Sequence, residues 1–326
     1  MRIHRRQFLA AATGAAICGL NRIAWAADPI GPQLIIDTHQ HLWVRDRIDP
    51  PWVGNAAGIL RLSYGPDEYR EATRGLNVRS IYMEIDAAEA DLDREAQTAI
   101  AWCSEKGSRM VGATIGGRPA SDGFADYITR HAASRSVQGV RRILHSGATP
   151  PGTCLDPKFI AGVKLLGERG LAFDLCMRPA ELDDAAKLVA ACPGTRFVLD
   201  HCGNADPKAF LKSDAAGRPS HSADDWKRSI AGLAALPNVV CKISGIVSRA
   251  PLTWDAAVLA PVVDHCLDSF GPDRVIFGSD WPVCLTRSTL QQWVTGLREI
   301  ISARPPADQE KLWSGNALRM YKLNIT

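Results

Sequence analysis

Two histidines, His39 and His41, stand two residues apart in a short apolar run near the start of the chain. On an extended strand, side chains at positions i and i+2 point to the same face. Two imidazoles side by side can bind a metal ion or polarise an oxygen atom. By itself such a pair is a weak indication of function, because a buried histidine often only satisfies a backbone group.

Further ionisable residues follow other apolar runs of the sequence. Glu84 is the last residue of one such run, His201 directly follows a second, and Asp280 comes shortly after a third. Several ionisable groups gathered at one place are costly to desolvate unless they have a task. We therefore expect His39, His41, His201 and Asp280 to meet in one catalytic site.

The elements that must position these residues are short strands alternating with helical stretches. Eight apolar or β-branched runs recur, at residues 33–37, 80–84, 110–115, 139–144, 171–175, 196–200, 238–243 and 274–278. Helical periodicity fills the gaps, for example over 91–106 and 181–192. This alternation predicts an α/β fold, a single (β/α)₈ TIM barrel whose active face lies at the carboxyl ends of the strands. An open doubly wound sheet is the main alternative, but no glycine-rich phosphate loop follows the first strand.

Four more residues are candidates for contact with substrate. Arg141 can hold a carboxylate with two parallel hydrogen bonds, or it can pair with a neighbouring carboxylate such as Glu84. Lys242 can likewise bind an anion, or pair with Asp200. Trp43 lies in the long connection that follows the first strand. Such a connection either shapes a substrate pocket or only covers the mouth of the barrel.

Five motifs in order along the chain resemble the amidohydrolase superfamily, and within it the TIM-barrel hydrolases that include the sugar-acid lactonases and 2-pyrone-4,6-dicarboxylate hydrolase. The motifs are IDTHQHLW (36–43), GVR (139–141), LDHCG (199–203), KISG (242–245) and FGSDWPV (277–283). The resemblance spans nearly the whole chain after its first 26 residues. It implies hydrolysis of a lactone ring.

The resemblance also implies roles for single residues. His39 and His41 fall in the metal-pair position, His201 in the sixth-strand position, and Asp280 in the proton-transfer position. The carboxylated lysine or fifth-strand histidine of metal-rich members is missing, since Cys176 ends the fifth strand. A two-metal centre is therefore not expected. One Zn²⁺ held by His39, His41 and Asp280, with Glu84 nearby, and activity without a metal both stay open.

These observations predict a lactone hydrolase in which Asp280 activates water and the histidines, or a metal bound to them, polarise the carbonyl. The expected substrate is a small carboxylated or polyhydroxylated lactone, with Arg141, Lys242, Glu84 and Trp43 in contact with it. Two alternatives stay open: a zinc-dependent non-oxidative decarboxylase of the same superfamily, and a binding protein for a carboxylated ligand that catalyses nothing.

The first 26 residues read as a removable export signal. They hold four arginines and no acidic residue, with the pair Arg5-Arg6 before Phe8-Leu9 and the cleavage-like Ala24-Trp25-Ala26. This segment resembles a twin-arginine signal, which predicts a periplasmic barrel over residues 27–326. The whole chain has a net charge of +3, and removing this segment leaves 34 basic and 35 acidic side chains, a net charge of −1. A near-neutral protein gives no reason to expect a nucleic-acid partner or a membrane anchor, and the oligomeric state is left open.

Eight cysteines follow this segment, scattered singly and mostly within apolar runs. A free cysteine in such a run behaves as a small apolar side chain. We therefore do not expect structural disulfides.

Overall fold

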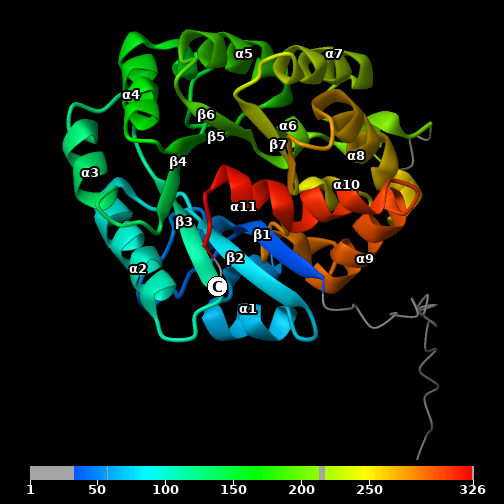
Figure 1. The fold of residues 1–326 in the computed structure, drawn as a ribbon, viewed down its shortest axis with the longest axis horizontal. Coiled ribbons are helices and arrows are strands. Elements are labelled where there is room, and N and C mark those ends of the chain that lie inside the picture. Colours follow the sequence, from blue (N-terminus) through cyan, green and yellow to red (C-terminus); the bar gives the residue numbers. More distant parts are fainter. Residues whose placement is uncertain (1–32, 57, 213–216, 325–326) are drawn as a thin grey trace, which may run out of the picture.

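The computed structural model describes residues 33–56, 58–212 and 217–324, and its centre is a barrel of eight parallel strands paired in chain order (Figure 1). The strands are β1 (Leu34–Gln40), β2 (Asn77–Met83), β3 (Met110–Gly116), β4 (Val137–Ile143), β5 (Ala172–Cys176), β6 (Arg196–Leu199), β7 (Val239–Ile243) and β8 (Val275–Phe277). The TIM barrel and all eight predicted strands are confirmed. The proposed export segment, residues 1–26, lies outside the described residues.

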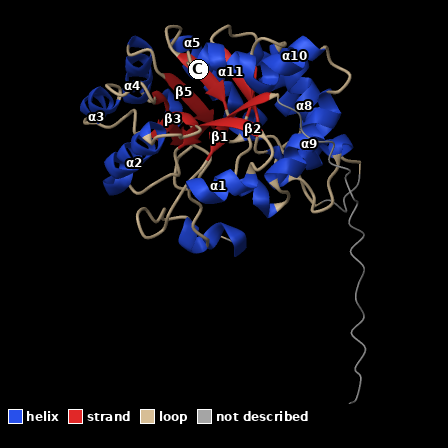
Figure 2. Ribbon diagram, turned by 60° about the horizontal axis from the view of Figure 1, so that its bottom comes forward, coloured by secondary structure: helices blue, strands red, loops and turns tan. Residues whose placement is uncertain are grey.

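Helices form an outer ring around the strands (Figure 2). Their bounds are α1 (Pro66–Ala72), α2 (Leu92–Ser104), α3 (Phe124–His131), α4 (Pro157–Glu168), α5 (Leu182–Ala191), α6 (His201–Asn204), α7 (Ala223–Ala234), α8 (Ala256–Phe270), α9 (Leu290–Ile301), α10 (Pro306–Glu310) and α11 (Asn316–Met320). Local sequence sets several of these ends. At α4, for example, the Asp156 carboxylate accepts the backbone N–H groups of Lys158 and Phe159, and Pro157 opens the first turn.

The barrel closes between its first and last strands at the level of the predicted site. Thr38 Oγ1 donates to the carbonyl of Phe277 over 2.6 Å, and Gln40 pairs with Trp281 in a parallel bridge. The N–H of Asp280 donates to the carbonyl of His39 at 2.8 Å. This join between β1 and β8 therefore brings the two ends of the barrel sequence together beside the histidines.

The interior of the barrel is apolar at one end and charged at the other. Its lower layer is made of Ile36, Ile81, Ala172, Val198 and Ile276, all fully buried. The carboxyl-terminal segment with α11 packs Ala317, Met320 and Tyr321 against that layer and covers this end of the barrel (Figure 1). The opposite end, where the strands finish, is thus the accessible mouth, as the barrel fold requires.

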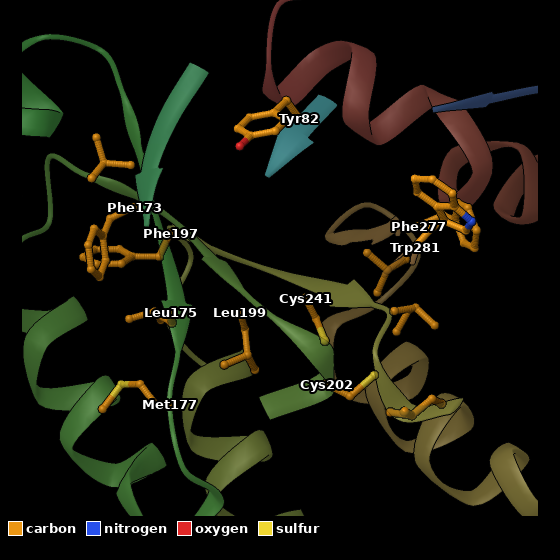
Figure 3. Packing of buried hydrophobic residues seen from close by; sticks show 14 of the residues in the cluster. Tyr82, Phe173, Leu175, Met177, Phe197, Leu199, Cys202, Cys241, Phe277 and Trp281 are labelled. Atoms are coloured by element: carbon orange, nitrogen blue, oxygen red, sulfur yellow. The ribbon is translucent and has the colours of Figure 1, made fainter. Parts of the chain in front are cut away.

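A second apolar layer lies outside the strands, under the helices. Phe173 and Phe197 stack edge to face on neighbouring strands, and Cys202 and Cys241 point toward each other (Figure 3). The eight cysteines of the described residues are all free thiols. Cys202, Cys241 and Cys266 are fully buried in this layer, where they pack as small apolar side chains. Within the described ranges, every helix is too short or too polar to cross a membrane.

Candidate active site

His39 in β1 and His41 just after it converge as predicted, with 3.2 Å between their Nε2 atoms. His41 Nδ1 faces the backbone carbonyls of Glu84 at 2.9 Å and Met83 at 3.1 Å. Because carbonyl oxygens only accept hydrogen bonds, Nδ1 of His41 must carry the proton. The other ring nitrogen, Nε2 of His41, faces His39.

Glycine at position 278 makes room for this arrangement. A Cβ atom there would lie 2.7 Å from Cβ of His39, which is closer than two carbon atoms can approach. Burial lowers the pKa of His39 well below its usual range, more strongly than Asp200 raises it. His39 is therefore a neutral imidazole at neutral pH.

Asp280 faces both histidines from the loop after β8. Its Oδ1 lies 3.5 Å from Nε2 of His41 and 3.8 Å from Nε2 of His39. Its backbone has a φ of 56°, a left-handed conformation that is unusual outside glycine. Ser279 steadies the same loop, because its Oγ accepts the N–H of Trp281 at 3.0 Å. Ser279 therefore holds the backbone of this loop.

His201 enters the site from the end of β6, with its ring centroid 4.3 Å from that of His39. Its Nδ1 lies 2.9 Å from Oγ of Ser244 in the loop after β7. Gly245 is required beside it, because a Cβ there would lie 2.2 Å from Nδ1 of His201. Burial lowers the pKa of His201 below its usual value. The structure thus brings together all four residues predicted to form the catalytic group.

His39, His41 and Asp280 fit a divalent metal of the zinc type. Zinc binds imidazole nitrogen and carboxylate oxygen at roughly 2.0–2.2 Å, so two ligands of a tetrahedral ion stand about 3.4 Å apart. The three donor atoms are separated by 3.2, 3.5 and 3.8 Å. Three protein ligands would leave a fourth position for water, as in catalytic rather than structural zinc sites.

Arg141 points into the mouth of the barrel, as predicted, but most of its donors are already used. Its Nε donates to the Glu84 carboxylate at 2.6 Å and its Nη2 to the Glu84 carbonyl at 2.8 Å. Arg142 points away and lies 3.6 Å from Asp86. Of the two possibilities for Arg141, the structure shows the ion pair with Glu84. Glu84 is itself buried by this pair, so the expected contact of its side chain with substrate is not what the structure shows.

Lys242 lies beneath the site and is fully buried. Its Nζ is 2.7 Å from Asp174 and 2.9 Å from Asp200. Burial alone would raise the pKa of Asp200, but the Lys242 ammonium and His39 hold it well below its usual range. Burial raises the pKa of Asp174 to about 7 despite the same ammonium. Lys242 thus pairs with two buried carboxylates and does not line the cavity, so the substrate contact expected of it is not what the structure shows.

A cavity of about 360 Å³ opens over the catalytic group, and His41, His201, Asp280 and Arg141 reach its wall. Trp43 does not, because it is buried and donates from Nε1 to the carbonyl of Leu62 at 2.7 Å. Its neighbour Trp52 lines the cavity in its place.

Sequence reasoning missed several residues of the wall, among them His145, Asn204 and Arg249, which line it together with Trp52 and Asp86. His145 could have been found from the sequence, because only Leu144 separates it from the end of strand β4. Arg249 comes from the loop after β7 and donates to Oδ1 of Asn204 at 3.0 Å. The wall therefore combines an aromatic ring with polar and cationic groups from different loops.

Comparison with known proteins places the fold and the site in context. The chain is 29% identical over 300 residues to an L-fucono-1,5-lactonase of Burkholderia multivorans, an alignment covering 89% of this chain and 96% of the relative. It superposes with a TM-score of 0.76 on a Burkholderia multivorans amidohydrolase crystallised with bound zinc, at 27% identity, covering 89% of this chain and all of the other. A probable 2-pyrone-4,6-dicarboxylic acid hydrolase of Acinetobacter baumannii shares the fold, with a TM-score of 0.69 at 14% identity, covering 88% of this chain and 99% of the other.

The family model described as amidohydrolase matches residues 36–323. This range includes every residue of the catalytic group and all eight strands of the barrel, apart from the first two residues of β1. This chain therefore belongs to the amidohydrolase family.

Proposed function

We propose that this protein hydrolyses the cyclic ester of a small lactone. The observation that carries the proposal is the position of Asp280, whose carboxylate oxygen lies 3.5 Å from Nε2 of His41 and 3.8 Å from Nε2 of His39 at the base of the cavity. The likeness to an L-fucono-1,5-lactonase supports a lactone, and a sugar-acid lactone in particular, as the substrate class.

In the proposed reaction, Asp280 takes a proton from a water molecule as that water attacks the lactone carbonyl. The developing oxyanion needs a positive or hydrogen-bonding partner. A divalent metal held by His39, His41 and Asp280 would supply Lewis acidity there and lower the pKa of bound water. The acyl-oxygen bond of the ring then breaks, and the ring oxygen receives the proton that Asp280 took. The product is a hydroxy acid that releases a proton at neutral pH.

The residues around the catalytic group keep it in place. Arg141 and Glu84 join β4 to β2 beside His39, and Ser244 orients His201. Cys176, at the end of β5, is fully buried and lies 3.9 Å from Arg141. It stands where the decarboxylases are expected to carry a histidine, so the structure gives that alternative no added support.

A panel of sugar-acid lactones and carboxylated pyrones, followed by acid release in weak buffer, tests the proposal. We expect at least one lactone to be opened, and the substitution Asp280→Asn to lower kcat by about 10²–10⁴-fold with an unchanged thermal unfolding temperature. Running the panel with added zinc and with chelator shows whether a metal is needed. Turnover by the folded Asp280→Asn protein at the wild-type rate would refute the role of Asp280.

We further propose that the protein acts in the periplasm after twin-arginine export. The support is the composition of residues 1–26, with Arg5-Arg6 and a cleavage-like Ala24-Trp25-Ala26. The family match begins after this segment, at residue 36.

A further inference from the structure

A second cavity, of about 310 Å³, lies outside the barrel, between helices α1 and α2 and over strand β2 (Figure 1). Its lining residues all differ from those of the cavity over the catalytic group. Leu42 lines the second cavity and His41 lines the first, so the chain just after β1 separates the two. Small-molecule sites in proteins have volumes of roughly 300–1,000 Å³, so the second cavity is large enough for a small ligand.

The inner wall of the second cavity is apolar and partly aromatic. It is formed by Leu42, Val78, Trp102 and Met110, together with Tyr69 of α1, and each of these residues is at most 7% exposed. Aromatic rings attract one another beyond the effect of the area that they bury. A wall with an indole and a phenol ring therefore suits a ligand whose body is a flat ring.

The rim of the second cavity carries an excess of positive charge. Among the described residues of its lining, three are basic, Arg70, Lys106 and Arg109, and one, Glu105, is acidic. Arg70 pairs with Asp67 at 2.6 Å, whereas neither Lys106 nor Arg109 has a carboxylate partner within the described part of the chain. These two cations beside an apolar wall are complementary to a ring that carries a carboxylate.

One side chain of this wall also supports the catalytic loop. The hydroxyl of Tyr69 donates to Oδ2 of Asp37 at 2.7 Å, and Oδ1 of Asp37 accepts the N–H of Ser279 at 2.7 Å. Asp37 is 1% exposed, so water does not compete for these hydrogen bonds. The ring of Tyr69 packs edge to face on Trp281, with 5.3 Å between the ring centroids. Tyr69 is thus linked to the residues on both sides of Asp280.

We propose that the second cavity binds a small aromatic carboxylate and that this ligand shifts the loop of Asp280 through Tyr69. The ring of the ligand contacts Trp102 and Tyr69, and its carboxylate pairs with Lys106 and Arg109. A change in the position of Tyr69 alters both the hydrogen bond to Asp37 and the packing on Trp281. The site is separate from the proposed active site, so the inference does not depend on lactone hydrolysis.

Binding of benzoate, followed through the indole N–H signals of protein labelled with ¹⁵N-tryptophan, tests the inference. Trp102 reports on the second cavity, Trp281 on the catalytic loop, and Trp52 on the cavity over the catalytic group. Each signal is assigned by its loss in the corresponding Trp→Phe variant. We expect saturable shifts of the Trp102 and Trp281 signals, and weaker binding of benzamide, which has the same ring without the charge.

Substitution of the two unpaired cations tests the chemistry of the rim. The double variant Lys106→Met and Arg109→Met should bind benzoate about fivefold more weakly, with an unchanged unfolding temperature. The matched control is Lys164→Met with Arg169→Met, which removes an exposed lysine and arginine at the end of α4, outside the cavity. This control should bind benzoate like the wild type.

Three results would count against the inference. The ligand site is overturned if Trp102 shows no saturable shift, including the case in which only the Trp52 signal moves. It is also overturned if the double variant at the rim binds benzoate with wild-type affinity. A saturable Trp102 shift with an unmoved Trp281 signal would overturn the link to the catalytic loop.

Discussion

Replacement of Lys242 by methionine separates its structural role from the substrate contact that the sequence suggested. The substitution keeps the length of the side chain but leaves Asp174 and Asp200 without the ammonium that lies 2.7 and 2.9 Å from them. Removing one partner from a buried ion pair costs roughly 3–5 kcal/mol in the free energy of unfolding. For a domain of about 300 residues we expect the unfolding temperature to fall by about 5–8 °C.

The loss should also depend on pH. Without the ammonium, the two carboxylates have a higher pKa in the folded than in the unfolded protein, so the folded state binds more protons. Stability then falls as pH rises, and the difference from wild type should be larger at pH 8 than at pH 5. The second substitution Asp174→Asn should restore part of the lost stability, because it removes one of the two uncompensated charges.

Thermal unfolding and steady-state kinetics of Lys242→Met decide between the roles. Lys158→Met is the matched control, because Lys158 pairs with Asp122 at 2.8 Å on the exposed surface. Its unfolding temperature should stay at the wild-type value. An unfolding temperature of Lys242→Met equal to wild type, together with a raised KM for the lactone, would refute the structural role and restore substrate binding.

Three further predictions concern the cavity and the amino-terminal segment. Burial lowers the pKa of His145 to about 4, so the unfolded state binds more protons than the folded state below pH 6.5. Between pH 6.5 and 5 this removes about 1.5 kcal/mol of stability, and His145→Gln should lessen that loss in urea unfolding. Arg249→Met should raise KM for a carboxylated or polyhydroxylated lactone with little change in kcat, and an unchanged KM would argue against substrate contact. Replacing Arg5 and Arg6 by lysine should leave the protein in the cytoplasm on cell fractionation, and periplasmic activity would contradict twin-arginine export.

The fold could be predicted because the sequence pattern that indicates it lies within short stretches of the chain. Short β-branched runs alternate with helical periodicity, and the barrel turns that order directly into neighbouring strands. The catalytic group followed from the same rule, since His201 and Asp280 come just after two of these strands. Side chains alternate along β4, so only one of Arg141 and Arg142 can face the interior, and the match to the GVR motif indicated Arg141.

The depth of a side chain in the barrel could not be predicted in the same way. The alternation of side chains along β7 places Lys242 in the barrel interior. It does not show whether the ammonium group reaches the mouth of the barrel or pairs with Asp174 and Asp200 below it. The cavity wall was harder still, because Trp52 and Arg249 are placed by contacts between loops that are distant in sequence. Trp43 and Trp52 lie in the same connection, and only tertiary packing decides which of them faces the cavity.

The join between β1 and β8 has a consequence for the order in which the protein becomes active during synthesis. The backbone of His39, near the start of the chain, accepts its hydrogen bond from Asp280, near the end. A ribosome-bound chain lacking β8 and the loop after it would have His39 and His41 but neither the Asp280 carboxylate opposite them nor the strand that completes the barrel. Catalytic capacity therefore arises late, when almost the entire polypeptide has been made.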